Sequence, residues 1–186
     1  MVGPGSVALS SDATRRVSAV VGTVFFLLIA PGTVAGLVPW WISGWRMRAP
    51  LLHFSPFRWL GVLLILAGLP LLLDSFARFA LKGLRTPAPV FPTRHLVVSG
   101  LYRYVRNPMY LAVAAVTVGQ GLLFGDVRVL KYGVLVCLGF HMFVLLYEEP
   151  ALRRTFGTEY ETFCANVGRW IPRLSAWRGA ERYSVQ

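Results

Sequence analysis

The sequence predicts an all-α fold: an integral membrane helical bundle of about four transmembrane helices, followed by a C-terminal interfacial helix at the cytoplasmic side. Of the 186 residues, 55% are hydrophobic and only 15% are charged. The mean hydropathy is +0.57, a value typical of integral membrane proteins. A crossing needs roughly 20 residues at a rise of about 1.5 Å each. Four apolar segments satisfy that length, at about 17–42, 57–79, 108–124 and 129–147.

The first apolar segment follows Arg15 and Arg16 and is too long for a typical signal peptide, so we expect an uncleaved anchor. Pro31 with Gly32, and then Pro39, interrupt it. Because proline removes a backbone hydrogen bond, these residues predict either a kinked helix or a short re-entrant hairpin.

The connection before the third segment, residues 84–107, contains three prolines and is expected to be irregular. It ends in Asn107-Pro108, an N-cap residue followed by proline at the first helical position, which is a preferred helix start. The free N–H groups and the positive dipole end of this helix then lie beside Arg103 and Arg106. An anionic group is expected to bind well there.

The fourth segment is predicted to run antiparallel to the third, because only a tight turn at 125–128 joins them. Glu148 and Glu149 therefore return to the end that carries Arg106. A charged residue costs roughly 2.5–3.5 kcal/mol at mid-bilayer, so ionisable groups near that depth indicate a functional site. Pro150 is then expected to open a tail helix at the interface or over the site, with its apolar stripe formed by Leu152, Phe156, Tyr160, Phe163 and Val167.

The net charge is +11, but the basic residues lie between apolar segments and not along one polar face, so nucleic acid is not an expected partner. The N-terminus, residues 78–106 and the C-terminal tail together hold 14 of the 19 Lys and Arg. The positive-inside rule makes that side cytoplasmic. Both termini are therefore expected on the cytoplasmic side of a plasma or inner membrane. Cys137 and Cys164 are isolated, so neither a disulfide framework nor a metal site is expected.

Each polar feature also has a plainer structural interpretation. The arginines can be positive-inside anchors, and Glu148 and Glu149 can cap the tail helix or pair with those arginines. His141 can serve as a hydrogen-bonding residue between helices. Asp74 stands four residues before an arginine, which favours a local ion pair. Residues 119–121, Gly-Gln-Gly, indicate close helix packing more than a cofactor loop, since no strand precedes them.

Two blocks carry a resemblance to a known family. Residues 96–110 read LVVSGLYRYVRNPMY, and residues 147–160 contain the pattern YEEPxL followed by FGxEY, with a closing RWIP at 169–172. Over about residues 90–173 the chain resembles the isoprenylcysteine carboxyl methyltransferase and phospholipid methyltransferase superfamily of integral membrane enzymes. Length and composition predict one compact membrane domain over 1–186. Its N-terminal helices occupy 1–83, and the resemblance implies a methyltransferase core at 84–175.

That resemblance implies transfer of the methyl group of S-adenosylmethionine to a lipophilic acceptor at the cytoplasmic membrane interface. Superfamily members with a prenylcysteine substrate use an arginine near the position of Val144, and its absence here argues against that substrate. The implied cofactor-binding residues are His95, Leu96, Val97, Gly100, Tyr102, Asn107 and Tyr110, with Glu149 or Glu148 on the far side.

The residue chemistry agrees with that implication. S-adenosylmethionine carries a carboxylate, an ammonium and a sulfonium, which need a positive partner, a negative partner and an electron-rich wall. We assign catalytic roles to Arg106, which can hold a carboxylate, and to Glu148, which can accept a proton or orient an amine. Two other function classes stay open: a membrane enzyme like the sterol reductases, which uses NADPH, and a non-catalytic transporter or lipid-binding scaffold.

Overall fold

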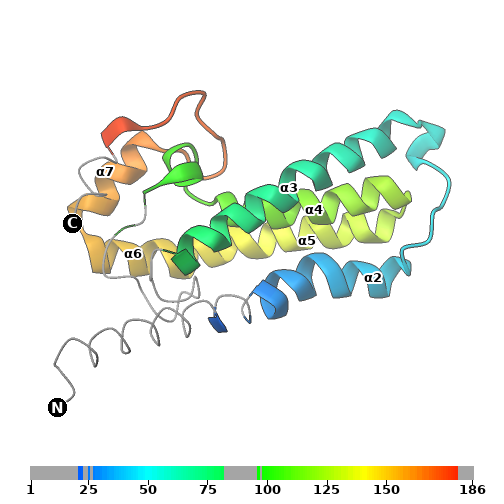
Figure 1. The fold of residues 1–186 in the computed structure, drawn as a ribbon, viewed down its shortest axis with the longest axis horizontal. Helices are drawn as coiled ribbons and strands as arrows, with labels where there is room; N and C mark the ends of the chain where they lie inside the picture. Colours follow the sequence, from blue (N-terminus) through cyan, green and yellow to red (C-terminus); the bar gives the residue numbers. More distant parts are fainter. Residues whose placement is uncertain (1–20, 23–24, 26, 82–95, 97, 180–186) are drawn as a thin grey trace, which may run out of the picture.

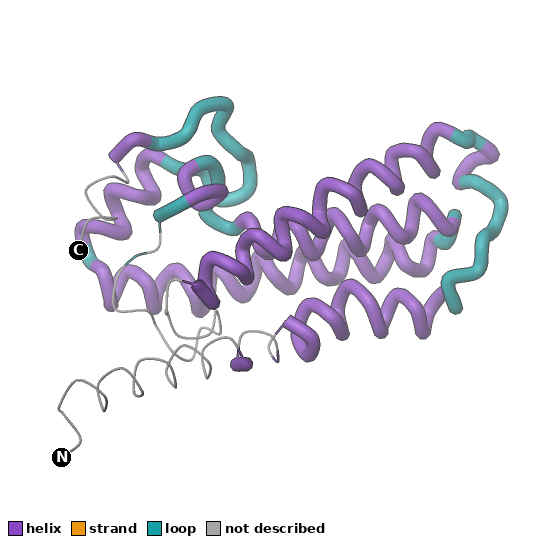
Figure 2. Tube along the Cα trace, in the orientation of Figure 1, coloured by secondary structure: helices purple, strands orange, loops and turns teal. Residues whose placement is uncertain are grey.

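The computed structural model describes residues 21–22, 25, 27–81, 96 and 98–179, and every regular element in this part of the chain is helical (Figures 1 and 2). The predicted all-α class is therefore confirmed. The elements are η1 (Thr33–Leu37), α2 (Val38–Ser43), η2 (Leu51–His53), α3 (Pro56–Leu81), η3 (Gly100–Arg103), α4 (Pro108–Phe124), α5 (Val127–Phe143), η4 (Val144–Glu148), α6 (Glu149–Phe156) and α7 (Thr158–Asn166).

Two helices in the described residues are long and apolar enough to cross a membrane, Pro56–Ala77 and Val127–Phe156. Two further apolar helices, Leu27–Ser43 and Pro108–Phe124, are shorter. All four lie side by side in one elongated bundle, with α7 and η3 at one end (Figure 1). Helices thus form where the four apolar segments predicted them, and two of the four reach spanning length by this measure. The start of the first segment, before residue 21, lies outside the described residues.

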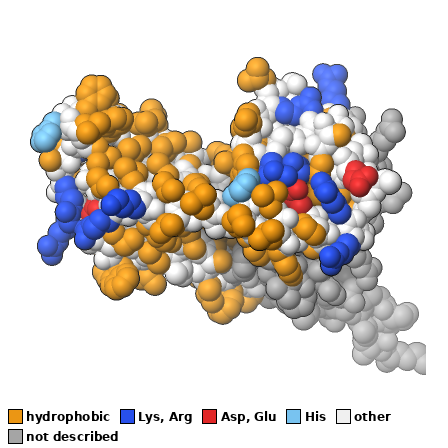
Figure 3. All heavy atoms as spheres, turned by 180° about the vertical axis from the view of Figure 1, so that it is seen from behind, with side chains coloured by type: hydrophobic (Ala, Val, Ile, Leu, Met, Phe, Trp, Pro, Cys, Tyr) orange, Lys and Arg blue, Asp and Glu red, His pale blue; other side chains and the backbone are white. Residues whose placement is uncertain are grey.

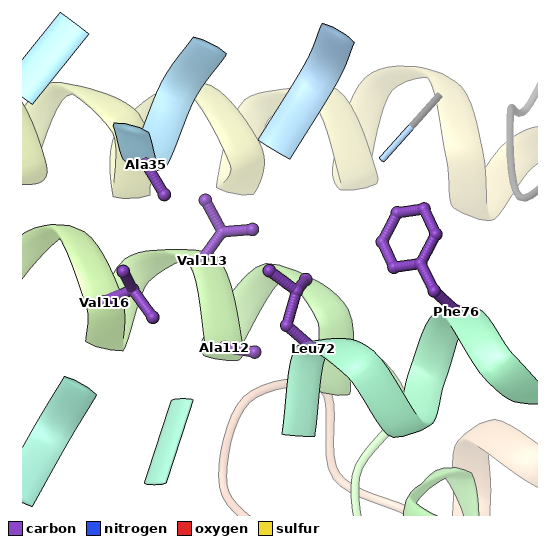
Figure 4. Packing of buried hydrophobic residues seen from close by; sticks show 6 residues of the cluster. All are labelled: Ala35, Leu72, Phe76, Ala112, Val113 and Val116. Carbon is purple, nitrogen blue, oxygen red and sulfur yellow. The ribbon is translucent and has the colours of Figure 1, made fainter. Parts of the chain in front are cut away.

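The bundle core lies where α3, α4 and η1 meet. Its buried apolar side chains point into the space between these elements (Figure 4): Ala35, Leu72, Phe76, Ala112, Val113 and Val116. Most other large apolar side chains on the helices face outward, for example Leu63, Leu66 and Leu135, each more than 60% exposed. A small core inside an apolar exterior is the arrangement expected of helices that pack in lipid.

Helices α3 and α4 approach each other closely at glycines. A Cβ added to Gly61 would lie 2.6 Å from the Gly119 carbonyl oxygen, and one added to Gly119 would lie 2.8 Å from the Gly61 carbonyl oxygen. A similar contact occurs further along α3, where a Cβ added to Gly68 would lie 2.9 Å from the Ala112 carbonyl oxygen. The packing role predicted for Gly119 is confirmed, because only a residue without a side chain lets the two backbones meet.

We expect Gly61→Ala to destabilise the bundle by about 1–3 kcal/mol, because the added methyl group meets backbone atoms that cannot yield without separating α3 from α4. Gly139→Ala is the matched control, since a Cβ there has no neighbour within 4 Å and alanine is the better helix former. Thermal unfolding in detergent micelles compares the two. Equal melting temperatures for both variants would contradict the close approach.

The first apolar helix runs unbroken through its prolines from Leu27 to Ser43, so the described residues show a helix with a π turn and not a re-entrant hairpin. Pro39 has no N–H, which leaves the Ala35 carbonyl without a helical partner. The Gln120 side-chain amide donates to that oxygen at 2.6 Å. The Val38 N–H, one residue before Pro39, donates to the Thr33 carbonyl five residues back. The freed Val34 carbonyl accepts the Tyr132 hydroxyl at 3.0 Å. Helix α4 and helix α5 therefore hold the proline segment.

The prediction that Pro150 opens a separate tail helix is wrong, because the helix continues from Val127 to Phe156. A π turn, η4, precedes the proline, and its Glu149 N–H donates to the Val144 carbonyl five residues back. This wider turn accommodates the proline ring, which clashes with the preceding turn of a regular α-helix. The helix ends instead at Phe156, and the following residue, Gly157, has a φ of +51°.

The apolar stripe predicted for the tail is confirmed. Its residues form a second buried cluster with the chain before η3, made of Leu96, Val98, Tyr160, Phe163 and Val167, with Leu152, Phe156, Cys164 and Trp177 packed against it. This cluster fixes α7 against the residues that lead into η3 and so shapes one end of the bundle.

Candidate active site

The segment after α7, residues 168–177, folds back onto the segment before α4. The Arg106 N–H donates to the Gly168 carbonyl, the Arg173 N–H to the Tyr104 carbonyl, and the Trp177 N–H to the Arg103 carbonyl, each at 2.9 Å. These bonds join parts of the chain more than sixty residues apart. The two segments thus lie at the same end of the bundle, as the predicted helix directions require.

Glu149 is the centre of a buried ionic triad at this end. The residue is 4% exposed, and its Oε1 lies 3.1 Å from Arg106 Nη1. Arg169 binds the same carboxylate with two donors, Nε to Oε1 at 2.6 Å and Nη2 to Oε2 at 3.0 Å. A buried carboxylate needs such partners, since an unpaired charge is costly to desolvate. With two cations and one anion, the triad keeps one excess positive charge.

Two buried donors lack a hydrogen-bond partner within the described part of the chain: Arg106 Nε, in the triad, and Ser99 Oγ, in the residue before η3. Arg106 Nη1 also lies 2.7 Å from Cys164 Sγ. Buried polar groups are normally satisfied, so an orphaned guanidinium nitrogen next to excess positive charge points to an absent acceptor. The site is suited to an anionic group such as a carboxylate.

Glu148 points to a different partner, because neighbouring residues on a helix project about 100° apart. Its Oε2 accepts the Tyr110 hydroxyl at 2.8 Å. Burial raises the pKa of the Tyr102 hydroxyl, and the negative charges of Glu148 and Asp74 raise it further. The phenol of Tyr102 therefore stays protonated.

An open groove of about 510 Å³ borders this region. Its walls come from α3, η3 and the returning tail: Pro70, Leu71, Asp74, Gly100, Leu101, Arg103, Tyr104 and Ala176. Arg103 is held by its Nε, which donates to the Trp177 carbonyl at 2.9 Å. The groove is mostly apolar, with one acidic and one basic residue in its walls, and α3 contributes three of its lining residues.

The structure brings together most of the residues predicted for the site. Arg106, Tyr102, Tyr110 and the two glutamates converge as expected, and Gly100 lines the groove with a φ of +57°. The Leu96 side chain is buried in the tail cluster. His95 and Val97 lie outside the described residues.

Asn107 directly precedes α4, which confirms the predicted helix start. Its side chain, however, does not cap the helix. The side-chain amide instead donates from Nδ2 to the Arg169 carbonyl at 3.2 Å. The connection before it also differs from the expected irregular chain, because Gly100–Arg103 forms a 3-10 turn. Asn107 thus fastens the returning tail to the start of α4.

Sequence reasoning gave no site role to Arg169 or Cys164. The need of a buried Glu149 for cationic partners could have pointed to Arg169. No sequence signal pointed to Cys164, which lies in α7. His141 does serve as a hydrogen-bonding residue, since its Nδ1 accepts the Trp170 indole N–H at 3.0 Å. Its partner lies in the returning segment 168–177 and not on another helix, as the alternative had it. The pairing of Glu149 with arginine, also among the plainer interpretations, is confirmed.

Apolar helices with a buried ionic cluster and an open groove at one end mark a candidate functional site where polar and apolar groups meet. A family model described as phospholipid methyltransferase matches residues 56–159, more than half of the chain. The chain belongs to the phospholipid methyltransferase family, whose members are membrane methyltransferases that act on lipids. The comparisons with curated proteins and with solved structures found no match. The matched residues include Arg106 and both glutamates, whereas Arg169 lies beyond them.

Proposed function

We propose that the protein transfers a methyl group from S-adenosylmethionine to a lipophilic acceptor at the cytoplasmic face of a plasma or inner membrane. The observation that carries this proposal is the net positive triad with the orphaned Arg106 Nε, at the start of α4 and beside Glu148. Family membership supplies the reaction class.

The residues present fit the proposed cofactor. The free donors of Arg106 and Ser99 suit its carboxylate. The rings of Tyr102 and Tyr110 and the Glu148 carboxylate suit its positively charged groups. Both oxygens of Glu149 already bind guanidinium groups, so we assign this residue to holding Arg106. An oxygen that contacts the cofactor would do so while it also binds a guanidinium group.

When bound, S-adenosylmethionine supplies an activated methyl group on sulfur. The protein then needs to align donor and acceptor and to keep water out, which together can lower the barrier by several kcal/mol. Glu148 is placed to accept a proton from the acceptor heteroatom, and the Tyr110 hydroxyl orients its carboxylate. The groove along α3 gives the acceptor a path from the apolar surface.

The proposed topology has all four apolar helices crossing the bilayer. The two shorter ones have 17 residues each, Leu27–Ser43 and Pro108–Phe124, at the lower limit for a crossing. The end that carries the triad then faces the cytoplasm, because most Lys and Arg lie in the segments assigned to that side.

The proposal is tested with detergent-purified protein and S-adenosylhomocysteine, measured by calorimetry. Arg106→Lys keeps a positive charge for Glu149 but removes Nε, so we expect about a tenfold loss of affinity. Arg154→Gln, an exposed residue of α6, is the control and should bind as the wild type does. In parallel, labelled S-adenosylmethionine should transfer its methyl label to the lipid extract of membranes. Binding of NADPH in place of S-adenosylhomocysteine, or label that stays out of the lipid fraction, would overturn the proposal.

A further inference from the structure

A second charged region lies at the opposite end of the bundle from the triad. Residues 44–58, between α2 and the first turn of α3, and residues 125–131, at the start of α5, contain five basic residues and a single acid. Figure 3 shows charged side chains gathered at two separate ends, with an apolar surface between them. We name the second region the basic rim, formed by Arg46, Arg48, Arg58, Arg128 and Lys131.

The one acid of the rim, Asp126, is already engaged. Its side chain is 2% exposed, and it lies 3.2 Å from Arg48 Nε and 2.7 Å from Arg128 Nη2. It also caps α5 by accepting the Arg128 N–H at 3.0 Å. The hydrogen bonds from Arg128 hold the pKa of Asp126 below its usual range. The acid thus stays ionised and fixes two arginines, which remain 51% and 56% exposed.

Arg58 adds a donor that the protein does not use. Its Nη2 donates to the Arg48 carbonyl, while its Nε is buried without a partner among the described residues. The exposed indoles of Trp41, Trp45 and Trp59 belong to the same end, 80%, 52% and 71% exposed. Indole rings favour the headgroup level of a bilayer, so they place the rim at the depth of lipid phosphates.

We propose that the basic rim binds the phosphate groups of anionic phospholipids in the leaflet opposite the catalytic end. Five cations and one ionised acid leave a net positive charge that the positive-inside rule does not call for on this side. Guanidinium groups match phosphate oxygens in geometry and charge. Arg58 Nε, in addition, has no acceptor among the described residues. This binding does not depend on the methyltransferase reaction.

The test is native mass spectrometry of protein in detergent micelles titrated with phosphatidylglycerol or phosphatidylcholine. The variant Arg46→Gln/Arg58→Gln/Lys131→Gln removes three cations and leaves the Asp126 pairs intact. Each cation near a membrane surface is worth about fivefold in binding, so we expect a loss of phosphatidylglycerol affinity of about 100-fold. Arg153→Gln/Arg154→Gln/Arg178→Gln removes the same charge at the other end and should lose less than fivefold.

Three outcomes would overturn the proposal. Equal losses in both triple variants would mean attraction by net charge alone. Equal affinity of the wild type for phosphatidylglycerol and phosphatidylcholine would mean that the rim does not select anionic lipids. Displacement by millimolar glycerol 3-phosphate would show a site for soluble phosphate and not a lipid surface. The double variant Arg46→Lys/Arg58→Lys guards against misfolding, since it keeps the charge and should retain most of the binding.

Discussion

Glu149→Gln is expected to cost about 3–5 kcal/mol of stability. The amide keeps the shape of the side chain but removes the charge that two guanidinium groups share, and its NH₂ group would face other donors. Arg106 is only 10% exposed and so loses its compensation, whereas Arg169, at 29%, regains part of its hydration. The cost should therefore fall in the lower half of that range.

The second expected result of Glu149→Gln is loosening of the tail segment 168–177, because the Arg169 ion pair is one of the side-chain contacts that anchor it. Limited proteolysis should cut this segment faster in the variant, while thermal unfolding in detergent reports the overall loss. Glu148→Gln, one residue earlier, is the matched control and should keep the wild-type melting temperature. A Glu149→Gln protein that melts and resists protease as the wild type does would contradict the triad as a stabilising element.

Glu148→Gln is expected to lower kcat for methyl transfer by about 100-fold or more, because the amide cannot accept a proton from the acceptor. The affinity for S-adenosylhomocysteine should stay within a few-fold of the wild type. Initial rates with labelled S-adenosylmethionine, combined with calorimetry, separate the two effects.

Tyr110→Phe accompanies this test, since it removes the hydroxyl that orients Glu148 but leaves the carboxylate in place. Its effect on kcat should be smaller, about tenfold. If Glu148→Gln instead abolishes S-adenosylhomocysteine binding with kcat unchanged at saturation, the residue binds cofactor and does not act as a base.

Much of the fold could be predicted from local sequence pattern. Helix α4 begins at Pro108 and ends at Phe124 as predicted, because Asn107-Pro108 and Gly125 mark its ends in the sequence. The close packing at Gly119 was also readable, since small residues in an apolar helix favour backbone contact. The antiparallel return of the glutamate pair followed from the shortness of the turn before α5.

The different partners of the two glutamates, arginines for Glu149 and Tyr110 for Glu148, could not be predicted from local sequence pattern. It depends on the rotation of the helix at η4 and on Arg169, which arrives from a segment whose position is set by tertiary hydrogen bonds. The continuation of the helix through Pro150 was missed for a related reason. Proline predicts a helix start from local chemistry, whereas a π turn lets the existing helix absorb it.

The charge of the site depends on a segment that follows α7. When residues 168–177 are undocked, Glu149 keeps Arg106 as its partner in the triad, and that pair is neutral overall. The excess positive charge that suits an anionic cofactor arises only when Arg169 docks. A bundle whose returning segment is undocked therefore has helices in place but lacks the electrostatic attraction for an anion.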